Sequence, residues 1–222
     1  MTASERTGIL AAIARTRSGT AADREAAVDR RFANLPRGPR LAIVADAIAE
    51  GASLADVFAA AATRSGATVV RAPSAAEVPA TLRTLWRENR LEGPLVRADD
   101  PLCAACDDLA PSHTGAAVGA DRVGISRAVA ALAETGSLIM ASADATPTTV
   151  NFLPETHVVV VAEADIHESL EDLWPELRAK GEWPRTINQI TGPSRTGDIE
   201  LTLQIGVHGP RALLIVVYGD GR

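Results

Sequence analysis

Two continuous apolar runs near the C-terminus constrain the fold of this chain most. "HVVVVA" at 157–162 and "ALLIVVY" at 212–218 are each as long as a strand and show no alternation of apolar and polar residues. A strand with one face in water alternates, whereas a strand of a parallel sheet covered by helices on both faces is apolar throughout. The two runs therefore predict central strands of a helix-covered parallel sheet.

Helix and strand signals alternate along the chain from residue 53. Ser53 is a good N-cap for "LADVFAAAATRS", Gly66 ends that helix, and "ATVVRA" follows as a strand. Three further segments are strand candidates: "LVRA" (95–98), "RVGI" (122–125) and "SLIMAS" (137–142). Three further segments are helix candidates: an apolar stripe from Val78 to Trp86, "SRAVAALAE" (126–134) and a segment that begins at Asp165. This order predicts an α/β fold with a Rossmann-like open sheet, in which ligands usually lie beyond the carboxyl ends of the strands.

The N-terminal region has a different character. Residues 4–34 have a loosely helical, charged pattern that "LPRGPR" (35–40) ends with two prolines and a glycine. We predict an N-terminal helical arm over residues 1–38 and one α/β domain over residues 39–222. The arm either docks a partner or covers one face of the core.

Composition excludes several classes of protein. The net charge is −6, and the aromatic residues are only three Trp, one Tyr and three Phe, which argues against a nucleic-acid partner. No run approaches the roughly 18 apolar residues of a membrane span. The N-terminus lacks a convincing secretory apolar segment, and two cysteines make no disulfide framework. We therefore expect a cytoplasmic protein with no membrane span.

The pair Cys103 and Cys106 has the spacing of redox or metal-binding cysteines. Two thiolates close a disulfide or supply half of a zinc site, but no further Cys or His donors stand at the usual spacing. An iron–sulfur cubane needs four thiolates, so we predict no iron–sulfur cluster and no metal site in this chain. Two buried structural cysteines are the favoured interpretation. The usual glycine-rich nucleotide loops are absent too, and the identity of any cofactor stays open.

A polar stretch, "TGPSRTGDIE" (191–200), is the first candidate site. Ser194, Thr196 and the glycine amides around Arg195 have the composition of an anion-binding nest, which predicts a small anionic ligand. Asp198 and Glu200 share one face if the segment is a strand, and occupy the first turn if it is a helix. The alternation that follows favours the strand.

A second candidate is His208, which stands between Gly206 and Gly209. A tight turn there presents an imidazole that serves as an acid, a base or a donor to an anion, or merely bonds a carbonyl; residue chemistry does not separate these roles. His157 and His167 are interpreted as structural or surface residues.

The third candidate is the turn "AETGS" (133–137). Glu134 and Thr135 directly precede Gly136 and a predicted strand. A carboxylate in such a turn acts as a nucleophile or base, or caps neighbouring amides, which is the more frequent role.

Four segments in this order carry a family resemblance: "ALAETGSLIM", "FLPETHVVVV", "ITGPSRTGDIEL" and "GVHGPRALLIVV". Together they resemble the LUD family, most closely its lactate utilization protein C branch. The resemblance identifies residues 39–222 as a LUD domain. It implies a fold of the NagB, ribose-phosphate isomerase and CoA-transferase-like type, and a role in oxidising L-lactate to pyruvate alongside iron–sulfur partner proteins.

Three hypotheses follow, and the sequence leaves open whether this chain itself is catalytic. The first is a lactate-oxidation component with a small-anion pocket, on which five residues are expected to converge: Glu134, Ser194, Thr196, Asp198 and His208. The second is a stand-alone CoA-transferase-like or phosphosugar-handling enzyme, and the third is a non-catalytic assembly subunit. The catalytic candidates are Glu134 and His208, and the ligand-binding candidates are Thr135, Gly136, Ser194, Thr196, Asp198, Glu200 and Gly209.

Overall fold

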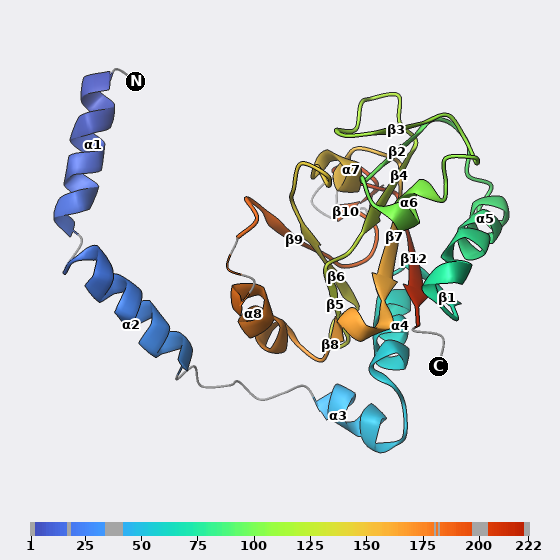
Figure 1. Cartoon of the computed structure of the whole chain (residues 1–222), viewed down its shortest axis with the longest axis horizontal. Helices are drawn as coiled ribbons and strands as arrows, with labels where there is room; N and C mark the ends of the chain where they lie inside the picture. The colour runs from blue at the N-terminus through green and yellow to red at the C-terminus, as the bar shows by residue number, and fades with distance from the viewer. Residues whose placement is uncertain are drawn as a thin grey trace. The chain divides into compact units, whose positions relative to one another are not determined.

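The computed structural model describes residues 3–16, 19–33, 42–179, 181, 183–196 and 204–219. The chain divides into two compact units, residues 1–40 and 41–222. The first contains two helices, α1 (Ala3–Thr16) and α2 (Ala21–Ala33), drawn in blue in Figure 1. Helices are therefore present where the arm was expected, whereas the boundary at residue 38 and the arm's role stay predictions.

The second unit is built around a six-stranded sheet in which every pairing is parallel. In spatial order the strands are β1 (Thr68–Ala72), β12 (Ala212–Tyr218), β7 (Thr156–Ala162), β4 (Val123–Arg127), β2 (Leu95–Arg97) and β3 (Ser112–Thr114). The two apolar runs form β7 and β12, which lie side by side within the sheet (Figure 1). The predicted α/β class with a parallel central sheet is confirmed.

Helices bury both faces of this sheet. Val159, Val161 and Ile215 pack on one face with Phe58 of helix α4 (Leu54–Arg64). The alternate side chains of β7 and β12, among them Val160, pack on the other face in a cluster that includes helix α5 (Val78–Glu88). Burial on both faces is the physical reason why these strands have no polar positions.

The helix boundaries follow the predicted caps in part. Ser53 and Asp56 form a capping box at the start of α4, and Gly66 follows its end with φ +95°. The helix predicted from Asp165 begins later, as α8 (Leu170–Ala179), because a short 3-10 turn (Glu163–Asp165) and strand β8 (Ile166–His167) come first. The other short elements are helices α3 (Ala42–Ala49), α6 (Pro101–Ala104) and α7 (Thr149–Phe152), and a 3-10 turn (Ala75–Glu77).

A second, mainly antiparallel sheet was not predicted. Its strand order is β8, β5 (Ala130–Leu132), β6 (Ser137–Ala141) and β9 (Ile187–Ile190), and only the β5–β8 pair is parallel. The short helix predicted over 126–134 is therefore wrong, because this segment finishes β4 and then forms β5. A two-stranded ribbon, β10 (Arg195–Thr196) with β11 (Gln204–Ile205), completes the described strands.

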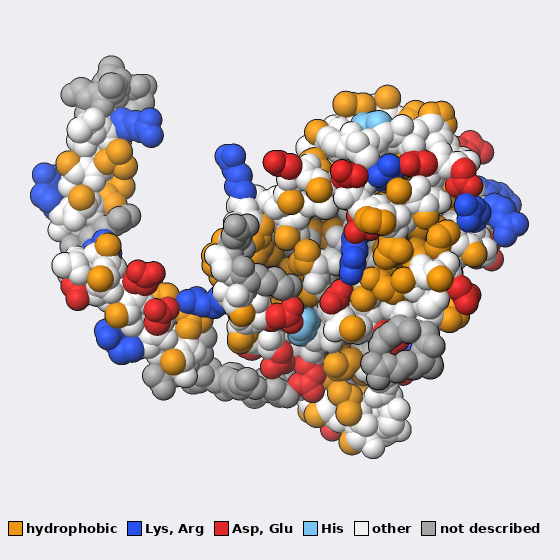
Figure 2. Space-filling model, in the orientation of Figure 1, with side chains coloured by type: hydrophobic (Ala, Val, Ile, Leu, Met, Phe, Trp, Pro, Cys, Tyr) orange, Lys and Arg blue, Asp and Glu red, His pale blue; other side chains and the backbone are white. Residues whose placement is uncertain are grey.

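On the face drawn in Figure 2, acidic side chains lie among the basic ones. No helix among the described residues is both long and apolar enough to cross a membrane.

Candidate functional site

The two glycine-bounded loops of the sequence lie side by side. The backbone N–H of Ser194 donates to the carbonyl of Pro210 at 2.9 Å, and the N–H of Gly206 donates to the carbonyl of Ser194 at 2.9 Å. β10 and β11 pair directly beyond these bonds. Segments 191–196 and 206–210, which we expected to meet at one pocket, therefore form one structure.

A cavity of about 540 Å³ lies between these loops and the main sheet. It is lined by segments 189–195 and 208–210 and by Ser65, Asn151, Phe152, His157 and Leu213. The lining residues include Arg195 and His208, whose side-chain types both bind anions in proteins.

The cavity lies at the amino ends of the central strands. His157 is the second residue of β7, and Leu213 is the second residue of β12. We had expected the ligand-binding loops to lie at the carboxyl ends, whereas these two loops lie at the amino ends. The reason is topological: segment 191–196 follows β9 of the antiparallel sheet, and segment 206–210 precedes β12.

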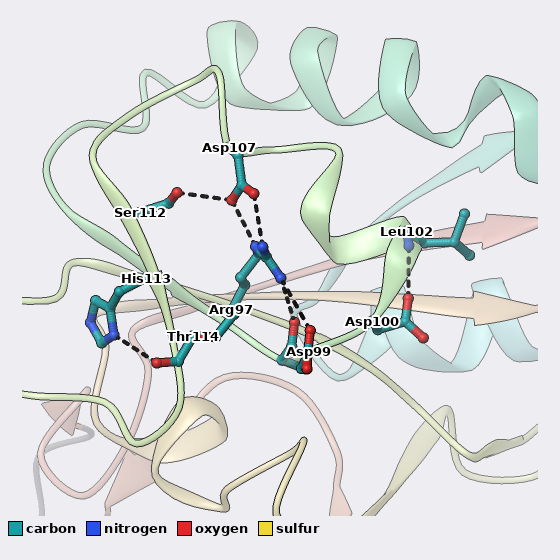
Figure 3. A network of polar contacts seen from close by, with 9 residues as sticks. Arg97, Asp99, Asp100, Leu102, Asp107, Ser112, His113 and Thr114 are labelled. Atoms are coloured by element: carbon teal, nitrogen blue, oxygen red, sulfur yellow. Dashed lines mark hydrogen bonds and ion pairs between the residues drawn. The ribbon is translucent and has the colours of Figure 1, made fainter.

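At the carboxyl edge, by contrast, the charged groups around β2 bind one another (Figure 3). Arg97, at the end of β2, donates from Nε and Nη2 to both carboxylate oxygens of Asp107 at 2.7 and 2.8 Å. Ser112 also donates to Asp107, and Asp100 caps the short helix α6. This bidentate pair raises the pKa of Arg97, and it fixes the loops that close this end of the sheet.

Helix α4 holds the first loop of the cavity in place. Gly192 has φ +71°, and a side chain there would clash with the carbonyl oxygen of Ser65 at the end of α4. The guanidinium of Arg195 lies against Gly66, where a side chain would also clash. Two glycines thus allow the loop and its arginine to lie directly on the end of the helix.

A chain of hydroxyl groups joins the "AETGS" turn to the cavity wall. Ser137 Oγ is buried, and it shares hydrogen bonds of 2.6 Å with Thr135 Oγ1 and with Thr191 Oγ1. Gln189 Nε2 also donates to Ser137 Oγ at 3.1 Å. Because Gln189 and Thr191 line the cavity, Thr135 is connected to it through Ser137.

The other residues of that turn have different surroundings. Gly136, with φ +69°, packs so closely on the backbone of Ala61 and Ala62 in α4 that any side chain would clash. The backbone N–H of Glu134 donates to the carbonyl of Glu168, and Glu134 is not among the described residues that line the cavity.

The remaining candidates divide into three groups. Ser194, His208 and Gly209 line the cavity, while Thr196 lies next to it in β10. Asp198 and Glu200 lie outside the described residues, as does the strand predicted for them.

A buried histidine of the cavity was missed. His157 is fully buried, its Nε2 lies 2.7 Å from Ser126 Oγ, and Ser126 Oγ donates to Asn151 Oδ1 at 3.1 Å. Burial lowers the pKa of His157 to about 3, so the ring is neutral. The available signal was a lone histidine at the start of a run of valines, which we had interpreted as structural or surface.

The two cysteines are buried in the hydrophobic cluster beneath α5. Burial raises the pKa of both thiols, to about 12 for Cys106. Among the described residues no group of three or more His, Cys, Asp or Glu side chains is placed to hold a metal ion.

Comparison with known proteins shows relatives over the C-terminal half. The LUD domain family model matches residues 117–218, which include every cavity-lining residue except Ser65. Lactate utilization protein C of Halalkalibacterium halodurans is 37% identical over 100 residues, which cover 43% of this chain and 44% of that protein. The protein of the same name from Geobacillus sp. (strain WCH70) is 37% identical over 110 residues, which cover 44% of this chain and 42% of that protein.

The matched segments thus span less than half of these curated relatives. A crystal structure of a DUF162 family protein from Deinococcus radiodurans superposes with a TM-score of 0.56 at 20% identity, covering 76% of this chain and 99% of that one. At this level of identity the superposition establishes a shared α/β fold.

Proposed function

We propose that this chain is a component of a lactate-utilization system and that its cavity binds a small carboxylate, L-lactate or pyruvate, because residues 117–218 match the LUD domain family model and resemble proteins named for lactate utilization. The observation that carries the proposal is the meeting of the two glycine-bounded loops around one cavity. This cavity belongs almost wholly to the part of the chain that resembles proteins named for lactate utilization.

The chemistry of the cavity wall supports a carboxylate ligand. A guanidinium is always charged, and it binds carboxylates with two parallel hydrogen bonds. Arg195 is one of the lining residues, with Ser194 beside it and His208 on the neighbouring loop, so the lining combines a cationic residue with small donors.

The proposal includes iron–sulfur partner proteins. Oxidation of L-lactate to pyruvate releases two electrons and two protons, and the electrons need an acceptor. The chain has two cysteines, whereas a cubane cluster needs four thiolates, so a cluster that accepts these electrons would belong to another protein. The finer fold assignment to the NagB and CoA-transferase-like type, a cytoplasmic location and partner docking by the N-terminal arm belong to the same proposal.

The CoA-transferase-like alternative has less support. It requires Glu134 as a nucleophile or base at the ligand, but Glu134 is outside the described lining of the cavity. We therefore place the ligand with the loops that carry Arg195 and His208.

The first test is carboxylate binding by the full chain, measured by titration calorimetry with L-lactate and with pyruvate. Arg195→Gln removes the guanidinium, and we expect affinity for both ligands to fall about tenfold or more. Arg83→Gln is the matched control, because Arg83 pairs with Asp108 and does not line the cavity. Equal affinities for the two variants would contradict the proposed site.

The second test concerns the partners. Lactate-dependent dye reduction is measured with the lone protein and after adding purified iron–sulfur proteins as candidate electron acceptors. We expect activity only from the mixture, and full activity from the lone protein would contradict the partner requirement.

A further inference from the structure

A second, larger pocket has no part in the proposed carboxylate site. Its volume is about 760 Å³, and it shares no described lining residue with the cavity at Arg195. Segments 141–144, 147–149 and 183–186 form most of its lining. Pockets for cofactor-sized molecules measure about 300–1,000 Å³ in proteins, so this one has room for a ligand much larger than lactate.

An exposed indole ring lines this pocket. Trp183 is one of only three tryptophans, and 52% of its surface is exposed. Its ring packs against Trp174 of α8, with ring centroids 5.9 Å apart, and Trp174 in turn packs on the hydrophobic cluster that includes Leu173 and Leu177. An aromatic ring that is held by a neighbour and open to a pocket is a platform for a planar ring, as in proteins that stack nucleotide bases.

A cationic side chain stands two residues after this platform. Arg185 lines the pocket, and among the described residues no carboxylate forms an ion pair with it, whereas Arg83 and Arg97 are each paired. A guanidinium binds a phosphate group through parallel hydrogen bonds. The other charged residue of the described lining is Asp144, whose carboxylate accepts hydrogen bonds from sugar hydroxyls or from the N–H groups of a base.

The walls of the pocket are fixed by hydrogen bonds at the end of β6. The backbone N–H of Ser142 donates to the carbonyl of Thr186 at 2.9 Å, and the N–H of Thr186 donates to Oγ of Ser142 at 2.9 Å. Oγ1 of Thr146 donates to the carbonyl of Ala141 at 3.0 Å, which closes the neighbouring loop. A preformed wall lowers the cost of ordering the site when a ligand binds.

We propose that this pocket binds a mononucleotide, with the planar ring stacked on Trp183 and the phosphate bound by Arg185. A small carboxylate has no ring to stack on Trp183, so the mononucleotide is a second ligand of the chain. The chain lacks the usual glycine-rich phosphate loops, and here a side chain takes the place of such a loop.

Helix α7 connects the pocket to the carboxylate cavity. Thr149, its first residue, lines the pocket, and Phe152, its last residue, lines the cavity; both also line a smaller hollow of about 440 Å³. A helix of four residues is about 6 Å long, so a nucleotide in the pocket lies near a carboxylate in the cavity.

Flavin mononucleotide and AMP are the two probes, because each combines a planar ring with a phosphate. The flavin ring also accepts two electrons, the number that oxidation of lactate releases. Only the choice of the flavin rests on the proposed function, since the site itself is argued from Trp183 and Arg185.

The first experiment tests the stacking platform with the full chain. Binding of each nucleotide is measured by calorimetry, and that of the flavin also by the loss of its fluorescence on stacking with an indole. We expect at least one nucleotide to bind, Trp183→Ala to lower its affinity about tenfold or more, and Trp183→Phe, which keeps a flat ring, to retain most of it. Undiminished affinity in Trp183→Ala would overturn the proposal.

The second experiment tests the phosphate contact. We expect flavin mononucleotide to bind about tenfold more tightly than riboflavin, or AMP about tenfold more tightly than adenosine. This difference is expected to disappear in Arg185→Gln and to persist in the control Arg83→Gln, whose arginine pairs with Asp108 outside the pocket. A difference that survives in Arg185→Gln would refute the role of Arg185.

The outcomes separate this proposal from the carboxylate site. If neither nucleotide binds the wild-type protein, the nucleotide site is refuted, while the carboxylate site is judged on lactate and pyruvate binding alone. Arg195→Gln is expected to leave nucleotide affinity unchanged, because Arg195 does not line this pocket. Failure of the carboxylate site would therefore leave the nucleotide site standing.

Discussion

The close contact between Gly192 and helix α4 gives the sharpest test of how the cavity is held together. Gly192 has φ +71°, and the position of its missing side chain is occupied by the carbonyl oxygen of Ser65. Gly192→Ala therefore has two separate costs. One is a left-handed backbone conformation that residues with a Cβ atom disfavour, and the other is a clash that moves the loop away from the helix.

The two costs can be worked out separately. A left-handed conformation costs about 1–2 kcal/mol for a residue with a Cβ atom. Forcing a methyl group into a filled space costs about 1–3 kcal/mol more. Gly181→Ala is the matched control, since Gly181 has φ +77° and no described atom lies within 4 Å of its Cβ position. Only the first cost applies to the control.

The measurement is the free energy of unfolding in urea, followed by tryptophan fluorescence. Gly192→Ala is expected to lose about 1–3 kcal/mol more than Gly181→Ala. Because Gly192 itself lines the cavity, this variant is also expected to bind carboxylates more weakly, whereas the control binds them normally. Equal losses of stability with unchanged binding in both variants would refute the packing argument.

Two further predictions concern titratable groups away from the cavity. The carbonyl of Thr114 and the carboxylate of Asp121 raise the pKa of His113 above 6.5. Protonated His113 therefore stabilises the folded protein fully below pH 6.5, and this stabilisation is lost as the pH rises through the raised pKa of the folded state. NMR titration of Asp121→Asn is expected to show a lower pKa for His113, and an unchanged value would contradict the ion pair. Because burial raises the pKa of Cys103 and Cys106, both thiols are expected to react with a disulfide reagent slowly in the native protein and rapidly in denaturant; fast reaction of the native protein would contradict their burial.

The central sheet was predictable because its signals are local and strong. The valines of 158–161 are buried on both faces of the sheet, and such burial leaves an unbroken apolar run in the sequence. The capping box of Ser53 is likewise visible as residue types at fixed spacing. In both cases the interaction that fixes the structure acts between neighbours in the chain or follows from its hydrophobic pattern.

The second sheet was not predictable in the same way. Segment 126–134 is rich in alanine, which favours helices, yet Ala130 and Ala131 are fully buried in β5 between β6 and β8. Pairing with two strands that are distant in sequence outweighs a helix preference of a few tenths of a kcal/mol per residue. Helix propensity alone therefore predicted a helix where the structure has strand β5.

The sequence predicted that the two glycine-bounded loops share one pocket, but it did not predict the edge of the sheet at which that pocket lies. Glycine, hydroxyl and arginine residues of 191–196 indicated an anion-binding loop, and their composition needs no tertiary information. The loop 191–196 lies at the amino ends of the central strands because it follows β9 of the antiparallel sheet, and that sheet was not predicted. His157 was missed for a similar reason, because its hydrogen-bond partner Ser126 stands 31 residues earlier in the sequence and lies 2.7 Å away only in the folded protein.

A single glycine explains how the chain of Ser126, Asn151 and His157 can form at all. Helix α7 crosses the amino end of β4 so closely that a side chain at Gly124 would clash with the carbonyl oxygen of Val150. This approach brings Asn151 of α7 within hydrogen-bond distance of Ser126 on β4, and Ser126 in turn reaches His157 on β7. Gly124 lines neither the cavity nor the hydrogen-bond chain, yet any larger residue there separates α7 from the sheet. The hydrogen bonds that hold the buried His157 ring therefore depend on packing at a glycine that does not line the cavity.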